Sequence, residues 1–195
     1  MIFWQIINTL FTSNTWVITF DEACWIVDCG DVEPIVQLIG EKPLAGVLLT
    51  HAHFDHIYGL NELLDRFPDT PVYTNESGRE ALLDDRKNMS RYHETPFVLK
   101  HPECIKIIQD GDLVELCDNV TAKVIATPGH NDSCLTFVMD DAIFTGDAYI
   151  PRIKVVTKLP GGDKNIAKQS LEIIAKLSKG KTVYPGHGDF EPLHT

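Results

Sequence analysis

The chain has 195 residues, of which 44% are hydrophobic and 23% are charged. This composition is typical of an ordinary globular protein, and the length favours one domain over residues 1–195. The formal net charge of −11 and the lack of a basic patch argue against a nucleic-acid partner. No apolar run approaches the length of a membrane span, and the apolar start lacks the features of a signal peptide. We therefore expect no membrane partner.

The cysteines predict a reducing environment. Their number, five, is odd, and none of them forms a Cys-x-x-Cys pair. Reduced thiols in a cytoplasmic protein fit this pattern better than a disulfide framework. The five residues are Cys24, Cys29, Cys104, Cys117 and Cys134.

The first half of the chain alternates short apolar runs with polar turns and helical patterns. Strands over residues 2–7, 15–20 and 23–28 predict an antiparallel meander. Asp31 can then cap a helix over residues 32–39. The next elements in order are a buried strand, a helix, a short strand and a helix, over residues 44–49, 59–67, 71–74 and 76–83.

A long irregular segment separates the two halves. Residues 84–101 are polar and charged, and lack apolar periodicity, which favours a variable insert or a lid near a site.

The second half is a further series of strands followed by a helix. Asp163 caps a helix that runs through Ser178 and carries Ile166, Ile173, Ile174 and Leu177 at helical spacing. Two series of strands, each followed by helices, predict an α/β fold: a sandwich of two mixed β-sheets with helices on both outer faces. The strands of this half are expected over residues 105–109, 113–117, 120–126, 133–139, 142–145 and 181–184.

The densest chemical signal is the run Thr50-His51-Ala52-His53-Phe54-Asp55-His56. It follows the predicted buried strand, so it lies at the carboxyl end of a strand, where α/β sheets usually place their sites. Three imidazoles and a carboxylate on so short a loop would repel one another or stay hydrated without a cation. Imidazole and carboxylate are ligands for zinc, and also for iron or manganese.

Three more ligand-type residues share one context. His130, Asp147 and His187 each follow a glycine, and each lies just past a predicted strand. Glycine permits the close approach and unusual backbone angles that a metal-binding loop needs. Each alone would be unremarkable, but together with the first run they predict one metal site.

These motifs resemble the metallo-β-lactamase superfamily over the whole chain. The four signatures are Thr-His-x-His-x-Asp-His at 50–56, Thr-Pro-Gly-His at 127–130, Thr-Gly-Asp at 145–147 and Pro-Gly-His-Gly at 185–188. The resemblance implies an αββα sandwich that binds two divalent metal ions, most often zinc, with iron or manganese as alternatives. It implies one metal held by His51, His53 and His130, a second held by Asp55, His56 and His187, and a bridging Asp147.

The resemblance also implies an activity. Two metals sharing a water lower its pKa, and the resulting hydroxide attacks a carbonyl or phosphoryl centre, with Asp55 placed to accept a proton. The small glyoxalase II-like hydrolases are the most similar branch, which implies hydrolysis of a small ester, thioester or lactone. Residues 160–163 (Pro-Gly-Gly-Asp) keep that branch's pattern, whereas Val155, Val156 and Lys158 depart from it. Full-size glyoxalase II also has a helical domain for which this chain has no counterpart.

Other activities stay open. A mononuclear iron persulfide dioxygenase would use His51, His130 and Asp147 as its ligands. A β-lactamase and a non-catalytic metal-binding protein are weaker alternatives.

The substrate is expected to be a small acidic molecule bound in an open groove. Its candidate contacts are Tyr58, Tyr149, Arg152 and Lys154, each of which has a packing or solvated role as its alternative, with Arg91 as a further cation. A homo-oligomer is compatible with the sequence. The remaining histidines, His93, His101 and His194, lack ligand context and are assigned no role.

Overall fold

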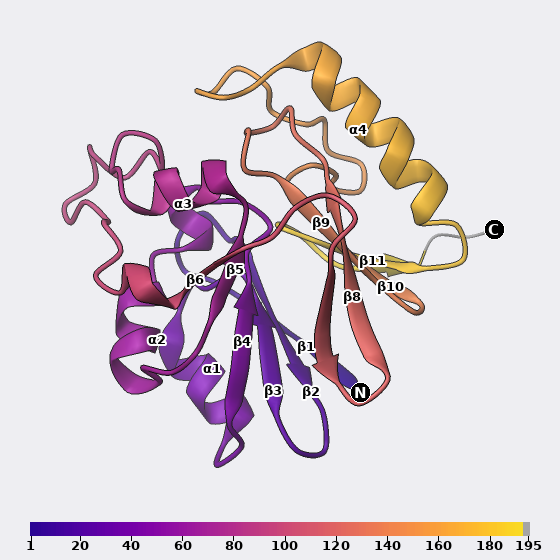
Figure 1. Cartoon of the computed structure of the whole chain (residues 1–195). Helices are drawn as coiled ribbons and strands as arrows, with labels where there is room; N and C mark the ends of the chain where they lie inside the picture. Colours follow the sequence, from indigo (N-terminus) through magenta and orange to yellow (C-terminus); the bar gives the residue numbers. More distant parts are fainter. Residues whose placement is uncertain (193–195) are drawn as a thin grey trace.

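The computed structural model describes residues 1–192, in which two six-stranded β-sheets face each other and helices cover both outer faces (Figure 1). The predicted αββα sandwich is therefore confirmed. His194, which has no predicted role, lies outside the described residues. No helix within residues 1–192 is long and apolar enough to cross a bilayer.

The first sheet has the strand order β1-β2-β3-β4-β5-β6. The first three strands pair antiparallel, as the meander pattern predicts, and β3 to β6 pair parallel. Parallel neighbours need crossover connections, and helices α1 to α3 lie in these connections. The bounds are β1 Ile2–Ile7, β2 Asn14–Thr19, β3 Cys24–Val27, α1 Val32–Ile39, β4 Leu44–Leu48, α2 Leu60–Arg66, β5 Val72–Thr74, α3 Glu76–Leu82 and β6 Ile105–Ile107, with 3-10 turns at Phe54–His56 and Pro102–Cys104.

The second sheet has the order β12-β11-β10-β9-β8-β7. Its strands pair antiparallel except β10 and β11, which are parallel and are joined through α4. Asp163 caps α4 as predicted, because its carboxylate accepts hydrogen bonds from the backbone N–H groups of Asn165 and Ile166. The bounds are β7 Leu113–Cys117, β8 Val120–Ala126, β9 Leu135–Met139, β10 Ala142–Gly146, α4 Lys164–Leu177, β11 Thr182–Pro185 and β12 Glu191–Pro192.

The core forms three apolar layers, one at each interface of the sandwich. Alternation along β2 shows how: Val17 packs toward the helices, whereas Trp16 and Ile18 pack between the sheets. A third cluster around Ile143 and Ile174 lies between the second sheet and α4. Both faces of the central strands are therefore buried, which explains their continuous apolar runs.

Two tryptophan side chains form hydrogen bonds between the sheets. The Trp25 indole N–H donates to the carbonyl of Leu116 at 2.8 Å, and the Trp16 indole N–H donates to the carbonyl of Pro185 at 3.0 Å. Each large ring is thus buried with its one polar atom satisfied. The hydrogen bond of Trp16 fixes the carboxyl end of β11, and the predicted ligand His187 lies in the loop that follows.

Two local predictions were wrong. Asp31 makes no capping bond to α1, because its carboxylate accepts hydrogen bonds from Thr9 and Tyr58 instead. In α4, Ile166 and Ile173 are 39% and 40% exposed, although the helical pattern placed them on the buried face.

Candidate metal centre

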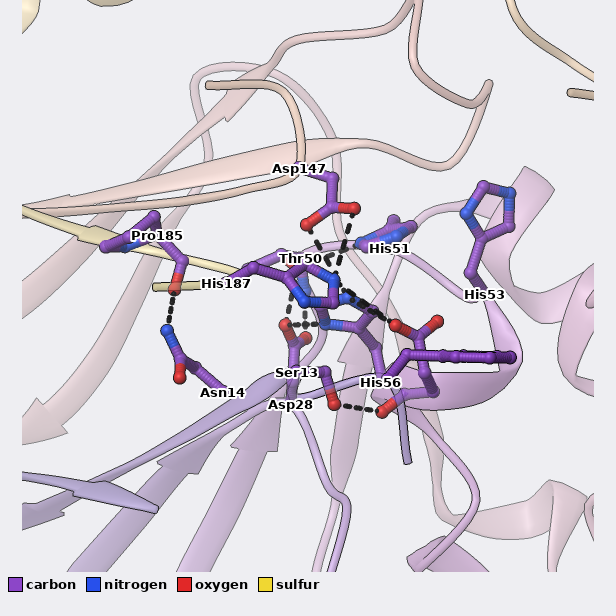
Figure 2. A network of polar contacts seen from close by, with 12 residues as sticks. Ser13, Asn14, Asp28, Thr50, His51, His53, His56, Asp147, Pro185 and His187 are labelled. Atoms are coloured by element: carbon purple, nitrogen blue, oxygen red, sulfur yellow. Dashed lines mark hydrogen bonds and ion pairs between the residues drawn. The ribbon is translucent and has the colours of Figure 1, made fainter. Parts of the chain in front are cut away.

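The seven predicted ligands meet where the carboxyl ends of strands from both sheets converge. The loop after β4 brings four of them, and the ends of β8, β10 and β11 bring one each. Figure 2 shows Asp147 and His187 turned toward His51 and His56. The structure therefore brings together every residue of the set: His51, His53, Asp55, His56, His130, Asp147 and His187.

One group consists of three histidines. The donor atoms of His51, His53 and His130 lie within 4.8 Å of one another, which is close enough to surround a single ion. Nε2 of His130 is 2.9 Å from Nδ1 of His53. Two of these residues come from the first sheet and one from the second.

The other group consists of Asp55, His56 and His187, whose donor atoms also lie within 4.8 Å of one another. Nε2 of His187 is 3.3 Å from Oδ2 of Asp55. The Asp147 carboxylate lies between the two groups: its oxygens are 3.6 Å from Nε2 of His56, His187 and His130. The geometry is thus that of two triads that share one carboxylate.

The donor atoms of the cluster fit a cation. Within residues 1–192, Nε2 of His51, Nε2 of His56 and Oδ1 of Asp147 are buried without a hydrogen-bond partner. Buried polar atoms are rarely left unpaired, because the loss of hydration is costly. All three atoms face the cluster that the other ligands surround, so a bound cation would satisfy them.

Hydrogen bonds at the far ring nitrogens turn the histidines toward the cluster. Nδ1 of His56 donates to Asp28 at 2.8 Å, and Nδ1 of His130 donates to the Val156 carbonyl at 2.9 Å. In a neutral ring each bond leaves a lone pair on the opposite nitrogen, Nε2, which is the arrangement that ligating histidines use.

Burial and nearby charges give the histidines of the two groups different protonation states. Burial lowers the pKa of His51 and His130, and lowers that of His53 to about 3, so these imidazoles are neutral at pH 7. Burial also lowers the pKa of His56, but the carboxylates of Asp55, Asp28 and Asp147 outweigh it and raise the pKa to about 10. Without metal, the second group is a charge-paired cluster.

Asp28 is a functional residue that the sequence reasoning missed. It is fully buried just past β3, and its carboxylate accepts from the Thr50 N–H at 2.7 Å, the Thr50 hydroxyl at 2.6 Å and His56 (Figure 2). The same hydroxyl oxygen is 3.2 Å from Nδ1 of His51 and can accept from it. One carboxylate therefore orients two histidines. A signal was available, since Asp28 ends a buried strand beside the strand that leads to His51.

The β1–β2 hairpin holds two ligand loops in place. The Ser13 hydroxyl donates to the Asp55 carbonyl at 2.6 Å, and the Asn14 side chain donates to the carbonyls of Pro185 and Gly188 at 3.0 and 2.8 Å (Figure 2). The loops carrying Asp55 and His187 are thus joined through one hairpin. Residue 186 must be glycine here, because a Cβ would lie 2.2 Å from Oδ1 of Asp147.

A pocket of about 320 Å³ opens onto the centre. This volume is at the lower end of the range for small-molecule sites. Besides ligands of both groups, the pocket is lined by apolar and aromatic side chains from four separate segments. Its lining residues are Phe11, His53, Phe54, Asp55, Met89, His93, His130, Asp147, Val156, Leu159 and His187.

The four predicted substrate contacts are absent from this lining. The Tyr58 hydroxyl donates to Asp31, and its side chain lines a different pocket. Tyr149 packs against the apolar cluster beneath α4. Arg152 and Lys154 are exposed at a tight turn that a β-bridge between Ile150 and Ile153 closes. From this part of the chain, Val156 and Leu159 line the pocket instead.

The 84–101 segment borders the pocket, as the sequence suggested, but through different residues. Arg91 pairs with Asp85 at 2.7 Å and does not line the pocket, whereas Met89 and His93 do. His93, to which the sequence analysis assigns no role, thus lies at the pocket. His101 lies 2.9 Å from Asp65, away from the centre.

Comparisons with known proteins agree with this architecture. A family model described as the metallo-beta-lactamase superfamily matches residues 8–187. A probable metallo-hydrolase from Streptococcus pyogenes is 30% identical, over 96% of this chain and 88% of its own length.

Two further proteins extend the comparison. A hydroxyacylglutathione hydrolase from Aliivibrio fischeri is 35% identical over 86% of this chain, which spans 58% of that relative's length. Among solved structures, the B3 metallo-beta-lactamase BLEG-1 has a TM-score of 0.85 at 27% identity, covering 97% of this chain and 93% of that one.

Proposed function

The chain belongs to the metallo-beta-lactamase superfamily, and from this membership we propose that it is a two-metal hydrolase of a small ester, thioester or lactone. The observation that carries the proposal is the pair of triads that share Asp147 at the floor of a small-molecule pocket. The family alone gives the class of chemistry, whereas the complete set of seven donors supports a binuclear centre.

The geometry supports one assignment of the residues that would hold the metals. His51, His53 and His130 would bind one divalent ion, Asp55, His56 and His187 the other, and Asp147 both. We propose zinc, because imidazole and carboxylate donors suit it, with iron or manganese as the alternatives. When bound, such ions lower the pKa of water and polarise a carbonyl.

Asp55 would act on the attacking water. Its carboxylate lines the pocket, with Oδ2 3.3 Å from Nε2 of His187. An ionised carboxylate at this position can accept a hydrogen bond from a water in the pocket, and then its proton. Asp28 and Thr50 hold the rings of His51 and His56 in their orientation during this step.

The substrate and setting are proposals of the same kind. The hydroxyacylglutathione hydrolase relatives support a thioester, but the chain spans little more than half their length, so the acyl group and thiol need direct measurement. The net charge of −11 supports a small molecule over a nucleic acid. All five cysteines are free, which supports a reducing, cytoplasmic setting.

A hydrolysis panel tests the proposal. Zinc-loaded and iron-loaded protein would be assayed with a hydroxyacyl-glutathione thioester, a simple thioester, a lactone and a β-lactam, beside Asp147→Asn as the inactive control. We expect the wild type to hydrolyse at least one acyl thioester or lactone. Oxygen uptake with glutathione persulfide and no hydrolysis would instead identify a dioxygenase, and β-lactam hydrolysis alone would identify a β-lactamase.

A further inference from the structure

Part of the pocket lining is apolar or aromatic and holds no predicted metal ligand. Apart from Phe54, these residues come from segments that carry no predicted ligand. Phe11 lies at the tip of the β1–β2 hairpin, Met89 and His93 lie in the 84–101 segment, and Val156 lies before α4. In Figure 1 the 84–101 segment is the magenta loop beside α3. These side chains have no ligand to orient, so the metal centre alone does not account for them.

His93 is the centre of an aromatic wall. Its ring lies 4.6 Å from the ring of Phe54 and 5.9 Å from the ring of Phe11, measured between centroids. Phe11 is nevertheless 63% exposed, so it offers a large apolar face that the fold does not use. Tilted aromatic faces of this kind favour a flat, uncharged group between or upon them.

The wall is preformed. The Asn88 side chain donates to the carbonyls of Ala81 and Phe97 at 2.9 and 3.0 Å, and the Ser90 hydroxyl accepts from the Phe97 N–H at 2.8 Å. Phe97 itself is buried in the core. The loop that presents Met89 and His93 is therefore anchored on both sides, and little conformational freedom would be lost when a ligand binds.

Two residues of the same wall have a strained backbone. Phe11 and Met89 have φ angles of 52° and 68°, in the left-handed region that non-glycine residues seldom adopt. Such conformations persist only where the surroundings impose them, and they gather at functional sites. In both cases the strained residue lines the pocket.

The wall offers no cation to an anionic side group. Among the residues that the structure describes, no lysine or arginine lines this pocket. A side-chain partner for the acidic substrate expected from the sequence is therefore missing from the wall. An apolar group would instead bury itself against the wall.

We propose that Phe11, Phe54, Met89 and His93 form a specificity subsite that binds the apolar or aromatic acyl side group of the substrate. This rests on the proposed hydrolysis, because the acyl carbonyl would lie over the metal centre at the floor of the same pocket. The preferred substrates are then neutral aryl or branched acyl thioesters or esters.

The test compares two substrates with the same leaving group. The S-phenylacetyl and S-acetyl thioesters of N-acetylcysteamine differ only in the acyl side group, and kcat/KM would be measured for both with zinc-loaded protein. We expect a preference for phenylacetyl of at least about tenfold, from apolar burial and aromatic contact. A wild-type enzyme that prefers acetyl would overturn the proposal.

Two variants test whether the preference for phenylacetyl arises at the proposed subsite. Phe11→Ala and His93→Ala should each lower kcat/KM for phenylacetyl several-fold, and leave that for acetyl within about twofold. Tyr92→Ala is the matched control, because Tyr92 is the neighbour of His93, is 95% exposed and does not line the pocket. It should change neither value. Equal losses for both substrates in Phe11→Ala and His93→Ala would overturn the subsite.

A binding experiment separates this proposal from the proposed function. Phenylacetamide would be titrated into zinc-loaded protein while the ring-proton NMR signals of His93 are followed. If no thioester is hydrolysed but these signals shift saturably in wild type and not in Phe11→Ala, the hydrolase proposal fails and the subsite stands. If hydrolysis is found but phenylacetamide leaves the His93 signals unmoved, the subsite fails and the hydrolase stands.

Discussion

Asp28 shows how the metal centre depends on a side chain that need not touch a metal. Its buried carboxylate accepts hydrogen bonds from Thr50 and from Nδ1 of His56. In Asp28→Asn the new amide would present a donor where an acceptor is needed, so the His56 ring loses its orientation. We expect metal affinity to fall about 10- to 100-fold, measured by competition with a chromophoric chelator.

Asp31→Asn is the control for Asp28→Asn. Asp31 also accepts several hydrogen bonds, from Thr9 and Tyr58, but it lies outside the cluster. Its replacement should leave metal affinity unchanged while lowering the free energy of unfolding. Equal effects of the two variants on affinity would mean that Asp28 supports the fold generally and not the histidines.

Asp147 and Tyr149 test the assignment of the shared carboxylate. Asp147→Ala removes the carboxylate that lies 3.6 Å from Nε2 of His56, His130 and His187, so we expect activity to fall by at least about 10³-fold. Tyr149→Phe, two residues on, should change kcat/KM less than about threefold, because Tyr149 packs beneath α4. The measurement is kcat/KM of fully metal-supplemented protein, and comparable losses in the two variants would argue against the assignment.

At the scale of single residues, the sequence predicts what a motif carries and misses what only the fold brings together. His51 to His56 are adjacent in the chain, so their chemistry is visible without a structure. Asp28 is joined to Thr50 only because β3 and β4 are neighbours in the sheet. His93 lacked a signal for the same reason, since Phe11 and Phe54 lie far from it in the chain.

At the scale of elements, the loop that carries His130 is fixed by its contact with α4. Gly129 has φ of 119°, and a Cβ there would lie 2.2 Å from the backbone nitrogen of Ala167. Gly129→Ala should therefore displace the loop, lower the free energy of unfolding by more than about 2 kcal/mol and weaken metal binding. Chemical denaturation and metal titration measure the two effects.

Gly111→Ala provides the comparison. Gly111 also has a positive φ, 88°, but nothing lies within 4 Å of its missing Cβ. The free energy of unfolding of Gly111→Ala should fall by about 1 kcal/mol from backbone strain alone, and this variant should bind metal normally. If Gly129→Ala behaves the same way, the contact with α4 does not position His130.

Element positions followed from apolar periodicity and turn residues, and most predicted boundaries lie within two residues of the observed ones. The strand over 113–117 and the helix over 32–39 have the predicted bounds. The 84–101 loop was less predictable, because side-chain bonds from Asn88 and Ser90 to distant backbone groups shape it. The exposure of Ile166 and Ile173 also needed the structure, since a helical pattern does not reveal how far a neighbouring sheet extends.

At the scale of the whole molecule, each triad draws ligands from both halves of the sandwich. The loop after β4 in the first sheet supplies two ligands to each, and His130 and His187 from the second sheet complete them. A bound metal is therefore a cross-link between the sheets. Beyond the meander of the first three strands, the pairing order within each sheet was not predicted, because local patterns do not specify distant neighbours.

Metal removal should consequently destabilise the whole fold. At a free metal concentration 100-fold above the dissociation constant, binding adds about 2.7 kcal/mol. For a chain of this size that corresponds to a rise in Tm of about 5 to 10 °C. Thermal unfolding with zinc and with chelator measures it, and an unchanged Tm would mean that the ligands do not join the sheets through a metal.

The stoichiometry of zinc binding to the metal-free protein shows whether the two triads hold two ions. Calorimetric titration, with elemental analysis of the product, would be made on the wild type and on His187→Ala, which removes one ligand of the second triad only. We expect two zinc ions per chain for the wild type and one for the variant. Saturation of the wild type at one ion or fewer, or two ions retained by the variant, would contradict it.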